Sequence, residues 1–358
     1  MKTVAIKKDY FEGVVSFDEN DGGVAPARLP VEQAALFPST DDGLMARALS
    51  PSGCRLRFVT DSSRLVVGVV PADTTAEPRS FDLCLDDRLL STVEIPSGAT
   101  QVEIELGAAG DEGGRRRGAS AGGAATAAKL GGIYELWFHQ FHKTILTSLE
   151  IDDGTSLEPA PDTRPRWVTY GSSITMCRQA ASPARTWPAT AARAGGVNLT
   201  SLGFAGQCHL DNMVARVIRD RAADIISLKL GINVFGASSL SARTYTAAVI
   251  AFVRTIRDGH PHTPIAIITA IPEIKRINTP NLLGLTLEQY REMTRDAARR
   301  LRTSGDDHLY LYEGNLLLHD DKTDLLPDGV HPNAAGYELM GRRFAETVLP
   351  ELLAAAGK

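Results

Sequence analysis

The stretch Trp167-Val-Thr-Tyr-Gly-Ser-Ser-Ile-Thr175 decides how the second half of the chain is interpreted. Its apolar part predicts a short buried strand over residues 168–170, and Gly171 allows the backbone to turn sharply after that strand. Ser172 and Ser173 then follow the carboxyl end of a strand, which is where open α/β sheets bind their ligands. A serine at such a position is a nucleophile only if other segments supply a base and an acid that activate it.

Strands and helices alternate through the rest of the sequence after this stretch. Apolar runs predict further strands at residues 198–202, 224–230, 264–270 and 309–313. Capping residues and amphipathic patterns predict helices at residues 186–195, 211–221, 241–258, 286–303 and 334–349. Five strands that alternate with helices predict an α/β fold, in which a parallel, doubly wound, flavodoxin-like sheet is covered on both faces.

The part of the chain before this region has the pattern of an all-β domain. Short runs typical of strands lie at residues 55–60, 64–70, 81–85, 89–95, 101–106, 133–138 and 144–151. Asp86-Asp87 is a candidate hairpin turn between two of them. Strands this short at this spacing favour a β-sandwich of the jelly-roll-like kind. Polar and apolar residues alternate in 55–60, which predicts a half-buried strand.

Two segments interrupt this pattern. Residues 107–132 are almost all Gly, Ala, Ser and Arg, so they predict a mobile loop whose arginines are either solvated or in contact with an anionic partner. Residues 154–166 hold three prolines together with polar and acidic residues, which is the composition of a linker. We therefore predict a β-sandwich domain over 1–155 and a second domain over 156–358.

Composition excludes several classes of partner. The 358-residue chain has a net charge of -5, which gives no electrostatic basis for binding nucleic acid or an anionic membrane. Neither a signal-peptide core nor an apolar run of membrane-spanning length is evident, so we expect a cytoplasmic protein. Cys54, Cys84, Cys177 and Cys208 lack metal-site spacing and predict free thiols, with a Cys177–Cys208 link as the alternative. The composition is compatible with a homo-oligomer.

Polar residues follow four of the five predicted strands, at ends that face the same edge of the sheet. Ser173 follows the first strand, Gly206 the second and Asn233 the third, and Asp328-Gly-Val-His331 follows the fifth. His331 is a base that can activate Ser173, and Asp328 can hold the other ring nitrogen of His331. The backbone N–H groups of Ser173 and Gly206 and the side-chain amide of Asn233 can bind the oxyanion of a tetrahedral intermediate.

These four blocks resemble the SGNH (GDSL-type) hydrolase superfamily over residues 165–350. Gly171-Ser-Ser-Ile-Thr175 corresponds to the family's Gly-Asp-Ser block, and Asp328-Gly-Val-His331-Pro332 corresponds to its last block. The resemblance implies ester or acyl hydrolysis without a metal or another cofactor. Ser172 and Val234 replace aspartates of the family pattern, which puts the local geometry in question. The preceding sandwich is similar to the layout of two-domain carbohydrate esterases.

The same edge of the sheet offers candidates for substrate contact. Trp187 and Phe235 are candidate apolar walls for a small acyl group. His209 either lines the pocket or bonds to backbone at the rim. Glu273 follows the fourth strand, where it either contacts substrate or forms a surface ion pair.

We therefore predict a serine ester hydrolase that removes a short acyl group, preferentially acetyl, from a carbohydrate or another small ester through an acyl-enzyme. The alternatives are a thioesterase or acyltransferase with the same residues, and a carbohydrate-binding protein with a vestigial hydrolase domain.

Overall fold

A computed structural model of the chain describes residues 1–19, 22–40, 43–75, 77–106, 132–271, 278–319 and 321–358. By internal contact, the chain forms two compact units that are each discontinuous in sequence. The first unit consists of Met1–Arg28, Leu49–Arg164 and Ser182–Ala184, and the second consists of Leu29–Ala48, Pro165–Ala181 and Arg185–Lys358. The division of the chain into a domain over 1–155 and a domain over 156–358 stays a prediction. The predicted loop over 107–132 lies almost entirely outside the described residues.

The second unit contains the predicted parallel sheet. Its strand order is β14-β13-β15-β16-β17, and every neighbouring pair is parallel, which confirms the flavodoxin-like α/β fold. The strands are β13 Arg166–Gly171, β14 Asn198–Gly203, β15 Ile225–Lys229, β16 Ile265–Ile268 and β17 Leu309–Tyr312.

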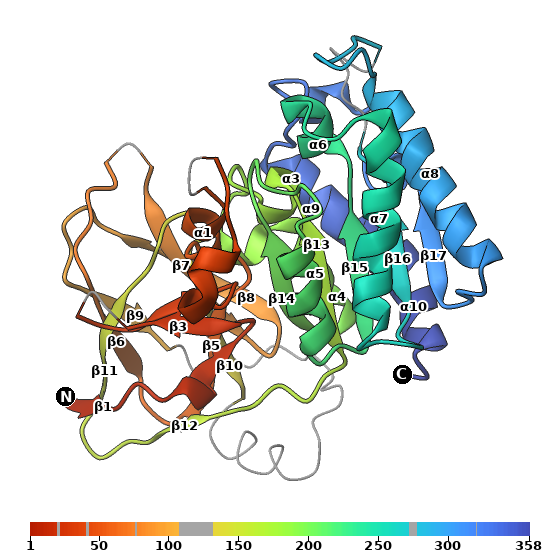
Figure 1. Ribbon diagram of the computed structural model, residues 1–358. Helices are drawn as coiled ribbons and strands as arrows, with labels where there is room; N and C mark the ends of the chain where they lie inside the picture. The colour runs from red at the N-terminus through yellow and green to blue at the C-terminus, as the bar shows by residue number, and fades with distance from the viewer. Residues whose placement is uncertain (20–21, 41–42, 76, 107–131, 272–277, 320) are drawn as a thin grey trace. The chain divides into compact units, whose positions relative to one another are not determined.

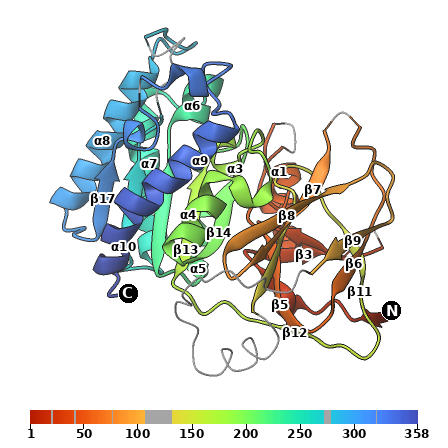
Figure 2. The same cartoon turned by 180° about the vertical axis from the view of Figure 1, so that it is seen from behind.

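Helices cover both faces of this sheet. Figures 1 and 2 show α5, α7 and α8 over one face and α4, α9 and α10 over the other. The helices of the unit are α1 Gly43–Ala48, α3 Ser173–Met176, α4 Trp187–Gly195, α5 Asn212–Asp220, α6 Ile232–Ala237, α7 Ala242–Arg257, α8 Leu287–Thr303, α9 Ala334–Arg343 and α10 Leu349–Ala355. Within the described part of the chain, none of the helices is long and apolar enough to cross a membrane.

Helix caps form where the sequence predicted them. The Thr186 side chain accepts a hydrogen bond from the Ala189 N–H at the start of α4, and Thr286 and Gln289 form a reciprocal capping box at the start of α8. Helix α4 ends at Gly195, because Gly196 after it takes the left-handed conformation with φ +64°. The helix predicted over 334–349 comprises α9 followed by a π-helical turn at Phe344–Val348.

The first unit is an antiparallel β structure with two main sheets. One sheet has the order β1-β11-β6-β9, and the other has the order β12-β5-β10-β7-β8 with β2 paired to β5. Leu65 and Ile104 of the first sheet belong to the same buried apolar cluster as Phe81 and Leu136 of the second, so the sheets share one core. The strands are β1 Lys2–Val4, β2 Phe11–Glu12, β3 Ser16–Asp18, β4 Ala25–Ala27, β5 Arg55–Thr60, β6 Arg64–Val69, β7 Arg79–Leu85, β8 Arg88–Ile95, β9 Gln101–Glu105, β10 Tyr134–Trp137, β11 Leu146–Ile151 and β12 Leu157–Pro159.

The predicted hairpin turn joins β7 to β8. Asp86 and Asp87 have φ angles of 47° and 67°, and Leu85 pairs with Arg88 across the turn. Two left-handed residues give the backbone twist that a tight hairpin needs, and aspartate adopts this conformation more readily than most residues.

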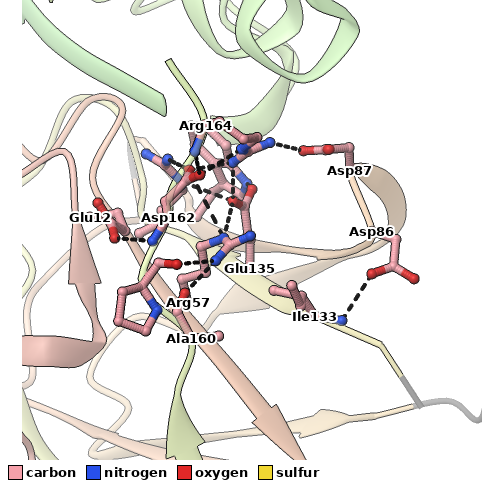
Figure 3. Close-up of polar contacts among 12 residues, drawn as sticks. Glu12, Arg57, Asp86, Asp87, Ile133, Glu135, Ala160, Asp162 and Arg164 are labelled. Carbon is pink, nitrogen blue, oxygen red and sulfur yellow. Dashed lines mark hydrogen bonds and ion pairs between the residues drawn. The ribbon is translucent and has the colours of Figure 1, made fainter. Parts of the chain in front are cut away.

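Two predictions about this unit are wrong. All of β5 is buried, including Arg55 and Arg57, because acidic side chains cover its polar face. The segment predicted as a linker instead contributes β12, which pairs with β5, and its Asp162 side chain is 0% exposed. Figure 3 shows Asp162 and Arg164 next to Arg57 and Glu135 in a cluster of ion pairs.

Candidate active site

Ser173 lies at the first turn after β13, where the sheet edge and a very short helix meet. Ser172 is the N-cap of α3, and its hydroxyl accepts a hydrogen bond of 3.3 Å from the Ile174 N–H. A side chain on Gly171 would collide with the Thr175 side chain, so only glycine lets α3 sit this close to the strand. The cap explains how Ser172 serves where the family pattern has aspartate, since both residue types cap helices.

Ser173, His331 and Asp328 form one chain of hydrogen bonds. The Ser173 Oγ lies 2.8 Å from the His331 Nε2, and the His331 Nδ1 lies 2.7 Å from the Asp328 Oδ2. The carboxylate accepts a hydrogen bond from the Nδ1–H, so Nε2 is the nitrogen whose lone pair faces the serine hydroxyl. The arrangement can therefore move a proton from Ser173 to His331.

Asp328 is held in its charged form. Its partial burial alone would raise the pKa of the carboxyl group, but hydrogen bonds from the backbone N–H and ring of His331 and from the Val330 N–H lower the pKa to about 2. The Asp328 Oδ1 accepts the two backbone bonds at 2.7 and 2.8 Å. These bonds also fix the direction of the carboxylate, which in turn orients the imidazole ring.

Gly206 and Asn233 belong to the loops after β14 and β15. The Asn233 Oδ1 accepts a hydrogen bond of 3.1 Å from the Cys208 N–H. With its oxygen engaged, the Asn233 side chain has its NH₂ group left to donate to a ligand. Gly206 is exposed and has φ +74°, a conformation that a side chain at this position would strain.

Comparison with known proteins assigns the sequence to a family. The GDSL-like Lipase/Acylhydrolase family matches residues 164–352, which is more than half of the chain and contains all five of these residues. The chain belongs to this family. Residues 10–116 match the N-terminal domain of SsfX3. Membership of the GDSL-like family makes the chain an enzyme of the acylhydrolase or acyltransferase class.

Solved structures similar to this GDSL-like protein include both kinds of enzyme. The salicylyl-acyltransferase SsfX3 from a tetracycline biosynthetic pathway is 31% identical, with 99% of this chain and 97% of that chain covered and a TM-score of 0.83. A protein from Bacteroides ovatus described as a GDSL-like lipase is 20% identical, with 96% and 95% covered and a TM-score of 0.71. A family two carbohydrate esterase from Clostridium thermocellum is 14% identical, with 96% and 98% covered and a TM-score of 0.62. The last two show a shared fold only, and no curated protein matches the sequence.

The predicted apolar walls of the GDSL-like site are wrong. Trp187 is 0% exposed because its ring packs in the core beside Trp167 and Phe344, with ring centroids 5.8 and 5.3 Å away. Phe235 is 2% exposed and packs edge-on against Tyr290. Trp187 begins α4 and Phe235 lies within α6, and sequence order alone does not reveal which side of a helix faces the core.

The other two predicted substrate contacts have different outcomes. The His209 ring nitrogens lie 2.9 Å from the Gly206 carbonyl oxygen and 2.8 Å from the Ser239 Oγ, so this histidine bonds to the backbone of its own loop. This geometry matches the interpretation of His209 as a rim histidine that bonds to backbone, and the bond stabilises the turn that carries Gly206. Glu273 lies outside the described residues.

None of the four cysteines forms a disulfide and all four are buried, so the alternative Cys177–Cys208 link is absent. Burial raises the pKa of the Cys208 thiol to about 12, and it raises the pKa of Cys177 as well. Neither thiol is therefore a competing nucleophile near neutral pH.

Lys229 is a residue of this region that the sequence analysis missed. It is a buried lysine at the carboxyl end of β15. The sequence feature that could have revealed it is a charged residue inside an otherwise apolar strand.

Proposed function

We propose that this GDSL-like enzyme is a serine ester hydrolase that removes a short acyl group, preferentially acetyl, from a carbohydrate or another small ester. The observation that carries the proposal is the hydrogen-bonded chain from the Ser173 Oγ through His331 to Asp328, with distances of 2.8 and 2.7 Å. A serine hydroxyl is a weak nucleophile on its own, and this chain supplies the base that removes its proton.

The proposed reaction has two halves. The Ser173 Oγ attacks the acyl carbonyl carbon while its proton passes to the His331 Nε2, and the carbonyl oxygen becomes an oxyanion. The Ser173 and Gly206 N–H groups and the Asn233 NH₂ group donate hydrogen bonds to that oxyanion. The C–O bond to the alcohol then breaks, and the alcohol leaves with the proton from His331.

Water completes the second half. It gives a proton to His331 as its oxygen attacks the acyl-enzyme, and the acid leaves as Ser173 regains its proton. No step requires a Lewis acid, because fixed N–H donors meet the developing charge. We therefore expect turnover to survive EDTA, and a loss that zinc restores would contradict this mechanism.

The preference for a short acyl group follows from where the apolar side chains lie. Long acyl chains need a sizeable apolar trough to remove them from water. Trp187 and Phe235 are in the core, so neither of the two predicted apolar walls can line such a trough. The carbohydrate part of the proposal is supported more weakly, by the fold that this chain shares with carbohydrate esterases.

An acyltransferase is the second candidate function. Its support is the 31% identity to the salicylyl-acyltransferase SsfX3 over 99% of this chain. In that case the same acyl-enzyme forms, but an alcohol other than water accepts the acyl group. Product analysis separates the two candidates, because a transferase gives a new ester and a hydrolase gives the free acid.

The decisive experiment replaces Ser173. We expect Ser173→Ala to lower kcat for p-nitrophenyl acetate by about 10⁴-fold or more, since residues of such a chain act as a unit. A fluorophosphonate should label the wild-type peptide that contains Ser173 and leave the variant unlabelled. Faster cleavage of p-nitrophenyl dodecanoate than of the acetate would contradict the short-acyl proposal alone.

The neighbouring serine provides a matched control. Ser172 is 0% exposed and its hydroxyl caps α3, so it does not reach a substrate. Ser172→Ala should therefore keep fluorophosphonate labelling and lose only the cap, which costs about 1 kcal/mol of stability. If Ser172→Ala abolished labelling and Ser173→Ala did not, the assignment of the nucleophile would be wrong.

A further inference from the structure

Lys229 is the last residue of β15 and lies beside the strand that leads to Ser173. In the parallel pair of β13 and β15, Tyr170 pairs with Leu228, so Lys229 is level with Gly171. The Thr169 and Ser227 hydroxyls are 2.9 Å apart, which shows that these two residues point to one face of the sheet. Side chains alternate along a strand, so the Lys229 side chain leaves β15 on that same face.

The same face carries α3, the helix that begins with Ser173. A side chain on Gly171 would meet Thr175 of α3, and a side chain on Gly203 of β14 would meet the α3 backbone at Met176. Two glycines thus make room for α3 directly on the sheet, and Lys229 occupies the corresponding position on the third strand. Its side chain therefore lies under the turn that presents the nucleophile.

Lys229 is also tied to the candidate oxyanion loop. The Lys229 carbonyl oxygen accepts a hydrogen bond of 3.8 Å from the Cys208 Sγ, and the Cys208 N–H is the donor that orients the Asn233 amide. Lys229 consequently lies between α3 on one side and the loop of Gly206 and Cys208 on the other.

The Lys229 ammonium is isolated. Its side chain belongs to a residue that is 2% exposed, and among the described residues its Nζ has no hydrogen-bond partner. The Thr175 Oγ1 is buried and unpartnered in the same way. Burial of an ammonium group without a counter-ion has a large free-energy cost, which an apolar residue of similar length would avoid.

The charge balance of the site indicates what this lysine offers. During attack, His331 gains a proton and the substrate oxygen gains a negative charge, while Asp328 stays negative throughout. The net charge of the reacting groups stays at one negative charge, but negative charge now appears at the substrate oxygen, next to the Ser173 N–H at the start of α3. A fixed cation under α3 attracts that new charge.

We propose that Lys229 is a positioning residue of the acyl-transfer site, whose buried ammonium charge stabilises the negative charge that develops at Ser173 and the substrate oxygen. This inference rests on the proposed function of Ser173. Lys229 does not touch the substrate, and it acts through the field that it places under α3 and the Gly206 loop.

The ammonium should lose its proton within the working pH range. Burial lowers the pKa of Lys229 to about 8, and only a charged thiolate at Cys208 or Cys177 would offset this effect. Those two are the titratable groups that face it, from the loop after β14 and from the end of α3, and both stay protonated at pH 8 because burial raises their pKa values. On the α9 side, Tyr337 lies near Cys177, and burial keeps its pKa well above the usual value. Activity that depends on the Lys229 charge should thus fall as pH rises through about 8.

The test compares Lys229→Met with the wild type, using kcat and KM for p-nitrophenyl acetate and the rate of fluorophosphonate labelling from pH 6 to 10. We expect kcat and the labelling rate at pH 7 to fall by about tenfold, less than for loss of a donor that touches the oxyanion. KM should change by less than about twofold, because a field that acts on the transition state leaves substrate binding unchanged. The decline of wild-type activity near pH 8 should be missing in the variant.

Two controls make the outcome decisive. Lys358→Met removes a half-exposed lysine that pairs with Asp224 and should leave kcat and the pH profile unchanged. Ser173→Ala in the same assays tests the proposed function itself, so an active Ser173→Ala variant would overturn both proposals. If Ser173→Ala is inactive, three results for Lys229→Met would each overturn the role of Lys229 alone. These are a wild-type kcat, a decline in activity near pH 8 as in the wild type, and a loss of activity only in proportion to unfolded protein.

Discussion

An ion-pair cluster in the β-sandwich unit and a single lysine in the α/β unit show two different ways of burying a charged side chain. In the sandwich, Arg55, Arg57 and Arg164 lie within 2.5–3.3 Å of carboxylate oxygens of Glu135 and Asp162. Figure 3 shows Arg57 and Glu135 on strands and Asp162 and Arg164 on the segment after β12, all in one cluster. In the α/β unit, Lys229 is equally buried and has no such partner among the described residues.

Pairing changes what burial does to each group. Burial alone would raise the pKa of Glu135, but the three arginines outweigh this and hold the pKa below its usual value. The pKa of Asp162 is lowered in the same way, mainly by Arg164. For Lys229 burial dominates, so its pKa falls. A paired charge of this kind holds segments together, whereas an unpaired charge costs stability and is kept only where it has another use.

The strongest test of this comparison breaks the sandwich cluster. Glu135→Ala leaves the buried Arg55 and Arg57 and the partly buried Arg164 with one acidic partner fewer, and we expect a loss of about 3–5 kcal/mol in the free energy of unfolding. Urea unfolding of the full chain measures it. Glu94→Ala, at an exposed position of β8, is the control and should change stability by less than about 0.5 kcal/mol. A loss below about 1 kcal/mol in the free energy of unfolding for Glu135→Ala would mean that the cluster contributes little to stability.

The second test removes the unpaired charge. Lys229→Met should stabilise the protein by up to about 3 kcal/mol at pH 7, since the folded state then no longer holds an ammonium with a lowered pKa. The folded pKa of Lys229 is about 8, so the unfolded chain binds more protons between pH 8 and about 10.5, and wild-type stability rises over that range. The advantage of the variant should therefore shrink as pH rises above 8. A variant that is less stable than the wild type at pH 7 would contradict an unpaired ammonium.

A third test uses acid. The folded pKa of Asp162 is lowered, so its contribution to stability is present above its unfolded pKa of about 4 and is lost as pH falls. Asp162→Asn should cost on the order of 2 kcal/mol at pH 7 and make unfolding less sensitive to pH between 5 and 2. Thermal melts at each pH would show this as a flatter acid limb. An unchanged acid limb would place the acid sensitivity elsewhere.

The smallest expected effect comes from a pair at the surface. Arg300 lies 2.7 Å from Asp296 on α8, and its side chain is 65% exposed. Solvent screens such pairs, so Arg300→Ala should change the free energy of unfolding by less than about 0.5 kcal/mol. A loss comparable to that of Glu135→Ala would show that burial is not what makes the sandwich cluster important.

The α/β unit was predictable because its signals are local. Apolar runs define the strands, and Thr186, Thr286 and Gln289 cap helices within a few residues of their own positions. The candidate relay could be predicted as well, since parallel strands bring Ser173 and His331 to one edge whatever lies between them. The donor bond from Cys208 that orients Asn233 could not be predicted, because it depends on loop conformation.

The failures share one cause, which is that a sequence pattern does not say what covers a side chain. Arg55 and Arg57 alternate with apolar residues, as in a strand with one solvent-exposed face. Carboxylates from segments distant in sequence nevertheless cover that face. Trp187 begins a helix near the site and turns into the core, where Trp167 lies. Lys229 in the apolar β15 is the opposite of the arginines, because its face of the sheet is covered and no described residue supplies a counter-ion.

The interleaved order of the two units limits how this protein can be cut or recombined. The chain changes from one unit to the other at residues 28/29, 48/49, 164/165, 181/182 and 184/185. A protease that cut once between Arg164 and Pro165 would leave Leu29–Ala48 of the α/β unit on one fragment and Ser182–Ala184 of the sandwich unit on the other. Neither fragment would hold a whole unit, so the nicked protein should stay together until it is denatured. For the same reason, a crossover between related genes cannot exchange either unit as a single uninterrupted piece.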